Sequence, residues 1–336
     1  MKNKPNFFQK PYRWAVLYGC TLTLAAAWVL LDGFVIPRQV QAIEPPAVTP
    51  PPAPSETVPT PTEPAPTVPA SPVSPEPQSS SEPETEPKPF IGFTANGYED
   101  ENIKLEISTM EYQDTTIYLA DIQLSDASLF KTALAQNAYG QNLKETTSEM
   151  AESHNAIFAV NGDYYGFRKE GYVLRGGTLY RDIPRSSGET EILVLYPDGR
   201  LEIREETAVT GEQLSKAGAK EVFSFGPSLV IDGEITVNPD DEVGMAMASN
   251  PRTALGMIEP LHYLAVVSDG RTAESAGLSL YQLAQVMQEA GCQLAYNLDG
   301  GGSSTMWFHG GVVNNPTSGR KIGERRVSDI VYIGYE

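Results

Sequence analysis

The chain has 336 residues, and its 43 acidic against 24 basic side chains give a formal net charge of −19. Such an acidic surface excludes the nucleic-acid-binding class, because phosphate backbones are bound through a basic footprint. The two cysteines are Cys20, which lies in an apolar segment, and Cys292. The remainder of the chain therefore cannot form a disulfide of its own, which suits a bacterial envelope protein better than a small secreted module.

The N-terminus combines a basic segment with an apolar run. Four basic side chains lie in residues 1–13, and 18 uncharged residues follow from Trp14 to Leu31. A run of about 18 apolar residues is near the lower limit for a membrane-spanning helix, and basic residues ahead of it favour a cytoplasmic N-terminus. We therefore expect residues 14–36 to be a signal anchor, with residues 1–13 in the cytoplasm. The alternative is a cleaved signal peptide, because Val40–Ala42 has a small-x-small pattern.

Residues 37–89 are predicted to be a disordered, Pro-rich linker. Residues 44–89 contain 17 of the chain's 27 prolines and no aromatic residue. Such a composition cannot bury enough apolar surface to fold. At about 3 Å per residue in the polyproline conformation, the segment could hold a domain on the order of 100 Å from a membrane.

Residues 90–336 are predicted to form one globular domain of the α+β class. Strand-like runs occur at 102–109, 115–124, 156–162, 191–205, 221–234, 292–298, 305–314 and 326–335, and the run at 191–205 is a hairpin. Helices are predicted at 144–155 and 279–291; in the second, Ser279 and Gln282 have the spacing of a capping box. Because strands outnumber helices without regular alternation, we expect a mixed, strand-rich sheet core with a few helices.

Five short stretches combine glycine with charged or amide side chains. They are NGDYY (161–165), RGG (175–177), NPRTALG (250–256), SDGR (268–271) and NLDGGGSS (297–304). Any one of them could be an ordinary turn, but tight loops at strand ends are also a usual way to aim polar groups. Asp163 and Asp299 each follow a strand, so their carboxylates could meet at one end of a sheet. Paired carboxyls suit glycoside cleavage and could also bind a hard cation.

Arginines near these loops offer rigid forked donors for phosphate or carboxylate, with surface ion pairing as an equally weighted alternative. A run of three glycines exposes successive N–H groups, and such a nest binds anionic oxygens without a cationic side chain. The residues expected to bind an anion in these ways are Arg252, Arg271, Arg325, Arg326, Gly300, Gly301, Gly302, Ser303 and Ser304.

Several common sites are not indicated. The glycine run lacks the lysine of a nucleotide-binding P-loop, and no G-x-S-x-G stretch is present. His309 is the histidine retained as a possible partner for a serine nucleophile. No His or Cys pair has zinc-ligand spacing. We predict no required cofactor, while a divalent cation remains possible, with the acidic stretch at 238–244 as a candidate that is more often a solvated loop.

Six stretches, taken in order, resemble the motifs of the phosphodiester glycosidase family. They are NGDYY, FGPSLVIDG (225–233), NPRTALG, VVSDGR (266–271), GCQLAYNLDGGGSSTMW (291–307) and VNNPTS (313–318). The resemblance covers about residues 101–336. It implies a hydrolase that removes a sugar linked through C1 to a phosphodiester.

The residues then receive hypothetical roles. Asp299 would act as nucleophile at C1 or as base on water, with Asp163 as its partner. Arg252 and Arg271 would hold the phosphate. Asn161 and Asn297 would bind the sugar hydroxyls. The further substrate- or phosphate-binding positions are Gly162, Arg175, Asp269, Gly300, Gly301, Gly302, Ser303, Ser304 and Arg325.

We expect the substrate to be a glycan or cell-envelope polymer that carries sugar-1-phosphodiester links. The protein would be membrane-anchored or secreted, with its catalytic domain outside the cytoplasm. One alternative is a non-catalytic envelope module that binds anionic glycan or peptidoglycan. Others are a phosphodiesterase that cleaves the P–O bond and a purely structural tethered domain.

Overall fold

The computed structural model describes residues 11–42, 92–188, 190–241, 249–319 and 321–336. Most of the expected linker (43–89) and residues 242–244 of the acidic stretch lie outside the described residues.

The apolar run near the N-terminus forms the helix α1 (Pro11–Phe34). Its segment Tyr12–Asp32 has a mean hydropathy of 1.8, which makes α1 the one described helix long and apolar enough to cross a membrane. A signal sequence would have the same properties, so both interpretations of this helix stand. The strand β1 (Arg38–Ala42) follows, inside the range expected as linker, and pairs antiparallel with β7 (Ala138–Gln141).

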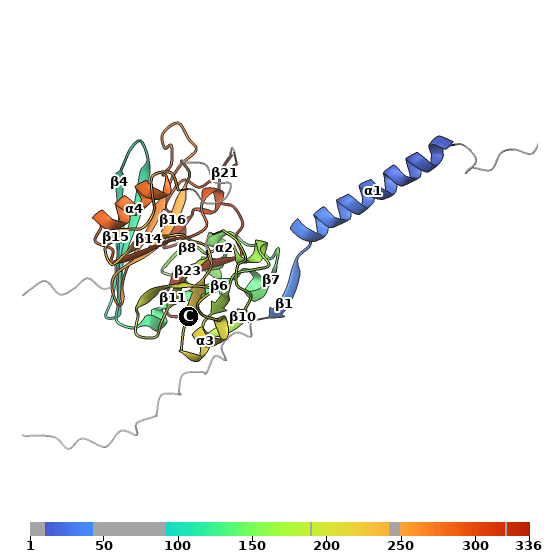
Figure 1. Ribbon diagram of the computed structural model, residues 1–336. Helices are drawn as coiled ribbons and strands as arrows, with labels where there is room; N and C mark the ends of the chain where they lie inside the picture. Colours follow the sequence, from blue (N-terminus) through green and yellow to red (C-terminus); the bar gives the residue numbers. More distant parts are fainter. Residues whose placement is uncertain (1–10, 43–91, 189, 242–248, 320) are drawn as a thin grey trace, which may run out of the picture. The chain divides into compact units, whose positions relative to one another are not determined.

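The remainder of the described chain is dominated by short strands (Figure 1). Besides β1 and β7 they are β2 (Gly92–Phe93), β3 (Gly97–Glu99), β4 (Ile103–Glu111), β5 (Thr116–Leu124), β6 (Phe130–Leu134), β8 (Phe158–Asn161), β9 (Val173–Arg175), β10 (Thr178–Arg181), β11 (Glu191–Leu195), β12 (Leu201–Glu205), β13 (Glu221–Phe223), β14 (Ser228–Ile231), β15 (Glu234–Ile235), β16 (Arg252–Glu259), β17 (His262–Ser268), β18 (Leu294–Asn297), β19 (Met306–Phe308), β20 (Gly311–Val312), β21 (Thr317–Ser318), β22 (Lys321–Ile322) and β23 (Asp329–Ile333). The α-helices after α1 are α2 (Thr147–Ser153), α3 (Gly211–Lys216) and α4 (Leu280–Glu289).

Three larger antiparallel sheets contain most of these strands, and β1-β7 and β21-β22 form two two-stranded sheets. The largest has nine strands in the order β15-β14-β18-β16-β17-β5-β4-β3-β2. Two five-stranded sheets have the orders β10-β9-β13-β11-β12 and β20-β19-β8-β23-β6. The prediction of a strand-rich α+β core with a few helices is confirmed.

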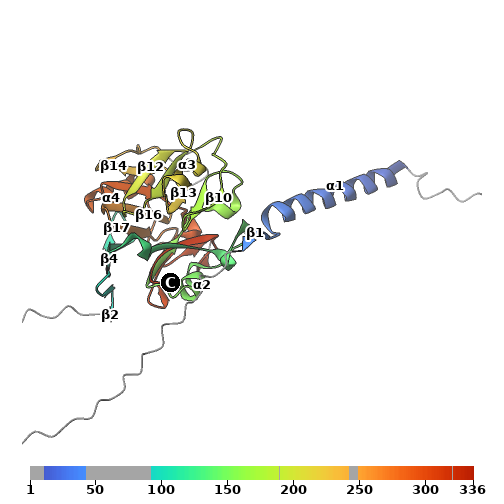
Figure 2. The same ribbon diagram turned by 90° about the horizontal axis from the view of Figure 1, so that it is seen from below.

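Both faces of the nine-stranded sheet are covered near its centre. Along β16 and β18, Leu255 and Tyr296 belong to a core shared with the two smaller sheets, whereas Ala254 and Ala295 pack in the cluster that contains α4. The alternation follows from the two-residue period of a strand. Figures 1 and 2 both show α4 beside β14 and β16. The other helices cover the smaller sheets, with α2 against β8 and β23 and α3 against β9 and β10.

The helix α4 begins as its sequence predicts. The Ser279 side chain accepts a hydrogen bond from the Gln282 backbone N–H, and the Gln282 side chain accepts one from the Ser279 N–H. Leu283, Val286 and Met287 are buried on its inner face. The six-residue α3 was not expected, since it has too few turns to show helical periodicity, although Thr210 and Gln213 form the same kind of cap.

The packing of α4 gives a stability prediction. We expect Leu283→Ala to lower the free energy of unfolding by about 2–5 kcal/mol, because it removes a fully buried side chain and leaves a cavity. The exposed Glu289 on the same helix is the control, and Glu289→Ala should change stability by less than about 0.5 kcal/mol. Urea unfolding of both variants measures the difference, and equal effects would contradict the packing described here.

Candidate active site

Two strands from different sheets end side by side and carry the conspicuous motifs. β8 ends at Asn161 and β18 ends at Asn297. The Asp299 N–H donates to the Gly162 carbonyl at 3.2 Å, and Asn161 Nδ2 donates to the Asp299 carbonyl at 2.6 Å. The stretches NGDYY and NLDGGGSS are therefore joined through their backbones.

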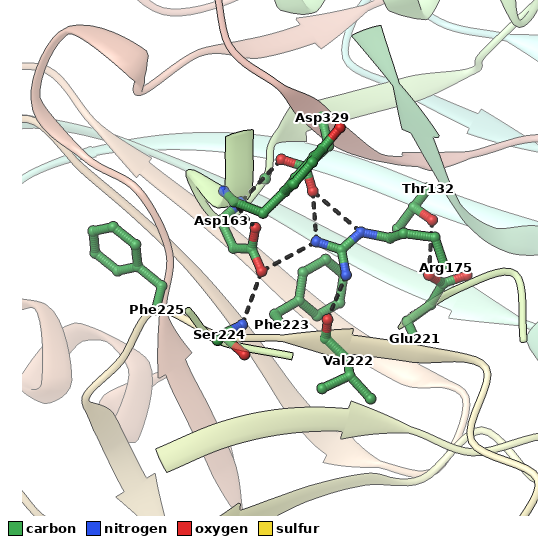
Figure 3. A network of polar contacts seen from close by, with 12 residues as sticks. Thr132, Asp163, Arg175, Glu221, Val222, Phe223, Ser224, Phe225 and Asp329 are labelled. Carbon is green, nitrogen blue, oxygen red and sulfur yellow. Dashed lines mark hydrogen bonds and ion pairs between the residues drawn. The ribbon is translucent and has the colours of Figure 1, made fainter. Parts of the chain in front are cut away.

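The carboxylate of Asp163 is fully buried in a network of polar contacts (Figure 3). It accepts hydrogen bonds from the backbone N–H groups of Ser224, at 2.8 Å, and Tyr165, at 3.1 Å. Arg175 Nη2 lies 3.1 Å from it and 2.7 Å from Asp329. Three acceptor positions of this buried carboxylate are thus taken by the protein itself.

The surroundings of Arg175 make this network a structural centre. Its guanidinium also donates to the Val222 carbonyl and lies over the Phe223 ring. Burial raises the pKa of Asp329, with the Asp163 carboxylate adding to the rise and Arg175 opposing it. Burial likewise raises the pKa of Glu221, next to Arg175, to about 7. Arg175 therefore holds together strands of both five-stranded sheets.

Several other predicted site residues also bond within the protein. Gly162 lies so close to the Asp329 carboxylate that a Cβ there would collide with it. The Asn161 side-chain oxygen accepts from Thr253 Oγ1, at 2.8 Å, and from the Thr305 N–H, at 3.2 Å. Asn161 thus connects β8, β16 and the glycine loop. Both of these oxygen positions, together with the Nδ2 bond to the Asp299 carbonyl, are unavailable to a ligand.

Asp269 and Arg252 lie behind the glycine loop. Asp269 accepts hydrogen bonds from the backbone and side chain of Asn315, at 2.8 and 2.9 Å, and from Asn314. It thereby fixes the VNNPTS segment. Arg252 is buried and its Nε donates to the Leu278 carbonyl at 2.9 Å. The structure therefore places neither side chain at an open surface.

The three glycines make room for neighbours and do not form a row of free N–H groups. The N–H groups of Gly301, Ser303 and Ser304 all donate to backbone carbonyls, so the expected nest does not form. Gly301 has a φ of +63° and its Cβ position lies 2.9 Å from Arg271 Nη2. The Cβ position of Gly302 lies 2.8 Å from Arg325 Nη2. A side chain at either position would displace a guanidinium, which explains the glycines.

Three arginines approach the Asp299 loop. Arg271 and Arg325 lie against the glycines. Burial lowers the pKa of Arg271, and repulsion by the Arg325 charge lowers it further. Arg168, which follows the NGDYY turn, lies over the Phe225 ring at 4.8 Å and donates to the Ser224 carbonyl at 3.2 Å. Arg326, the sequence neighbour of Arg325, is instead an exposed partner of Glu149 at 2.9 Å.

Asp299 is the carboxylate of this loop, and Arg168 and Arg325 act on its charge. Burial raises its pKa to about 6, while Ser303, Arg325, Arg168 and the Gly300 N–H oppose the rise. A carboxylate with this pKa titrates near neutral pH, as a catalytic group must.

The charges of the arginines are not neutralised by ion pairs. In the described part of the chain, no carboxylate oxygen lies within 4.0 Å of a guanidinium nitrogen of Arg168, Arg271 or Arg325. Residues 90–336 contain 35 acidic and 18 basic side chains, so acidic partners are abundant. Three uncompensated arginines around one loop indicate a site for an anion.

Unpaired polar atoms lie beside the same loop. Within residues 297–305, four buried side-chain oxygens have no hydrogen-bond partner among the described residues: Asn297 Oδ1, Ser303 Oγ, Ser304 Oγ and Thr305 Oγ1. Buried polar atoms normally find partners, so such a group needs an explanation. A polar ligand held at this loop supplies one. Of the predicted sugar-binding pair, Asn297 therefore keeps a free oxygen, while its Nδ2 donates to the Gly226 carbonyl at 2.7 Å.

Two further candidates from the sequence lie elsewhere. His309 stacks on Phe93 with ring centroids 3.8 Å apart, at the end of β19 opposite the glycine loop. Among the described residues, no group of three or more His, Cys, Asp or Glu side chains is arranged to hold a metal ion. The residue that sequence reasoning missed is Arg168. Its only signal was its position three residues after NGDYY.

Comparisons with known proteins give a family match and a curated relative. A family model described as phosphodiester glycosidase matches residues 154–334. The SPbeta prophage-derived uncharacterized protein YomE of Bacillus subtilis is 30% identical over 203 residues, which cover 59% of this chain and 31% of YomE. The chain thus spans about a third of the length of that relative.

A solved structure shows a similar fold. The zebrafish N-acetylglucosamine-1-phosphodiester alpha-N-acetylglucosaminidase catalytic domain, auto-inhibited by its pro-peptide, matches with a TM-score of 0.56 at 19% identity, over 73% of this chain and 87% of that chain. A hypothetical protein from Synechocystis matches with a TM-score of 0.48 at 14% identity, over 69% and 62% of the two chains. The family match covers more than half of the residues, and this protein belongs to the phosphodiester glycosidase family.

Proposed function

We propose that the protein hydrolyses the C1–O bond of a sugar 1-phosphodiester on a glycan or cell-envelope polymer outside the cytoplasm. The observation that carries this proposal is the set of uncompensated guanidinium groups of Arg168, Arg271 and Arg325 around the loop that contains Asp299. In this reaction an anion and an electrophilic carbon must both be bound next to one carboxylate. The arginines would bind the anion, and Asp299 would act at the carbon.

The chemistry places negative charge where the arginines are. Water adds to C1, the C1–O bond breaks, and the bridging oxygen leaves on a phosphate monoester that carries one more negative charge than the diester. Guanidinium groups fixed beside that oxygen stabilise the transition state more than the ground state. Such a leaving group reduces the need for a second carboxyl as general acid.

Asp299 acts as the base that takes a proton from the attacking water. A double displacement needs a second group for its hydrolytic step, and Asp163, which was expected to be that partner, bonds to Arg175, Ser224 and Tyr165 instead. A single displacement through Asp299 inverts the configuration at C1. Arg252 and Asp269 then support the loop, and Asn297 and Ser304 contact the sugar.

The first prediction separates the two aspartates. Asp299→Asn should lower kcat by about 10²- to 10⁴-fold, the usual contribution of a general base. It should not lower stability, because burial already disfavours that carboxylate. Asp163→Ala should lower the free energy of unfolding by about 3–5 kcal/mol, since it leaves buried donors unpaired. Turnover of an N-acetylglucosamine 1-phosphodiester and urea unfolding of the full-length protein measure both effects. Full activity of Asp299→Asn would remove this residue from the mechanism.

The second prediction concerns pH. Asp299 must be ionised to act as a base, so kcat/KM should rise with pH and level off above about pH 6. The Arg325 charge lowers the pKa of Asp299, so Arg325→Gln should shift the rising part of the pH profile, its acid limb, to higher pH. The substitution should also lower the rate.

Arg326→Gln is the matched control for Arg325→Gln, because the neighbouring arginine pairs with Glu149 on the surface. Its pH profile should coincide with that of the wild type. If the acid limb of the kcat/KM profile is at the same pH in Arg325→Gln as in the wild type, Asp299 does not control it.

The third prediction identifies the bond that breaks. Hydrolysis in ¹⁸O-labelled water should place the label on C1 of the released sugar and none on the phosphate monoester, as mass spectrometry of both products will show. Label in the phosphate would establish P–O cleavage. Saturable binding of sugar 1-phosphodiesters without hydrolysis, across a panel of sugars, would establish a non-catalytic binding module.

A further inference from the structure

Tyr164 has a backbone conformation that is unusual for an aromatic residue. Its φ of 71° and ψ of 16° lie in the left-handed region, which is rare and strained for a bulky side chain. The residues on either side, Asp163 and Tyr165, are both buried, and the Tyr165 N–H donates to the Asp163 carboxylate at 3.1 Å. The turn thus anchors its neighbours and leaves Tyr164 half-buried. Strain of this kind persists mainly where a function requires it.

The ring of Tyr164 is held in place from its own turn. Phe167 stacks on it with centroids 4.7 Å apart and an interplanar angle of 19°. The guanidinium of Arg168 lies over it at 5.5 Å and also over Phe225 at 4.8 Å. The side chain is therefore fixed among groups that already border the site.

Within the described residues, the hydroxyl of Tyr164 has no hydrogen-bond partner. It forms no hydrogen bond to any residue that the structure describes, whereas the hydroxyls of Tyr172, Tyr263 and Tyr296 donate to backbone carbonyls. Burial raises the pKa of Tyr164, and the Asp299 carboxylate raises it further, while Arg168 and Arg325 oppose these effects. The phenol therefore lies within electrostatic reach of Asp299 and of two of the three arginines that define the anion site, Arg168 and Arg325. It stays protonated at neutral pH and can donate one hydrogen bond.

We propose that Tyr164 is a further substrate-contacting residue, whose hydroxyl donates a hydrogen bond to a phosphate oxygen of the bound sugar 1-phosphodiester. This inference rests on the proposed function. The phosphate is the acceptor because Arg168 and Arg325, which surround the phenol, hold the anion. No proton is transferred, so the hydroxyl is a neutral donor that complements three cationic ones.

The test compares Tyr164→Phe with Tyr139→Phe in the full-length protein. Tyr139 is a suitable control because it is also half-buried and stacked on other rings, with Tyr165 at 5.5 Å and Tyr180 at 5.1 Å. Two quantities are measured: kcat/KM for a sugar 1-phosphodiester, and the inhibition constant of inorganic phosphate. Both substitutions keep the ring and remove only the hydroxyl, so thermal unfolding should stay unchanged.

We expect Tyr164→Phe to lower kcat/KM by about 10- to 100-fold and to weaken phosphate inhibition about 10-fold, as for a lost hydrogen bond to a charged group. Tyr139→Phe should change neither. If Tyr164→Phe equals the wild type while Arg325→Gln is impaired, this inference is overturned and the proposed function stands. A lower kcat/KM with unchanged phosphate inhibition would also overturn the phosphate contact. Absence of turnover and of phosphate binding in the wild type would overturn the proposed function, and this inference with it.

Discussion

The buried ion contacts of Arg175 are the constraint on which the site depends. One guanidinium lies between Asp163, at the end of β8, and Asp329, at the start of β23, and reaches the β13 backbone. Removing charges from water is costly unless each is paired and hydrogen-bonded. This requirement fixes where the chain turns after β8. Asp163 points inward to meet it, and the following residue, Tyr164, has the left-handed conformation.

Polar residues in this domain divide into two groups with different tasks. Asn161, Asp163, Asp269 and Arg252 are buried and bonded to other parts of the chain, so they hold loops from different sheets in register. Arg168, Arg271 and Arg325 are partly exposed and lack ion pairs with described carboxylates. The rigid group keeps the second group in position before a ligand arrives, and such preorganisation is the main source of electrostatic catalysis.

Local features were predictable from the sequence, and partnerships between distant segments were not. The strands 102–109 and 115–124 and the helix with Ser279 at its start depend on alternation, periodicity and capping, which neighbouring residues determine. Asp163 and Asp299 look alike in the sequence, since each follows a strand within a glycine-containing stretch. What separates them is Arg175 and Asp329, the latter 166 residues away from Asp163 along the chain. Arg168 was missed because its position also depends on a distant segment: its guanidinium lies over the ring of Phe225, which is far from it along the chain.

If the N-terminal segment is an uncleaved anchor, the strand β1 stays on the protein; if it is a cleaved signal peptide, β1 is lost. β1 is the hydrogen-bonding neighbour of β7 in a two-stranded sheet, and Asn142 Nδ2, just beyond β7, donates to the Ile36 carbonyl at 3.1 Å. Proteolysis after Ala42 would strip β7 of this neighbour and leave its ladder groups open to another chain. Retention of the leading helix would thus guard the enzyme against edge-to-edge association as well as attach it to a bilayer.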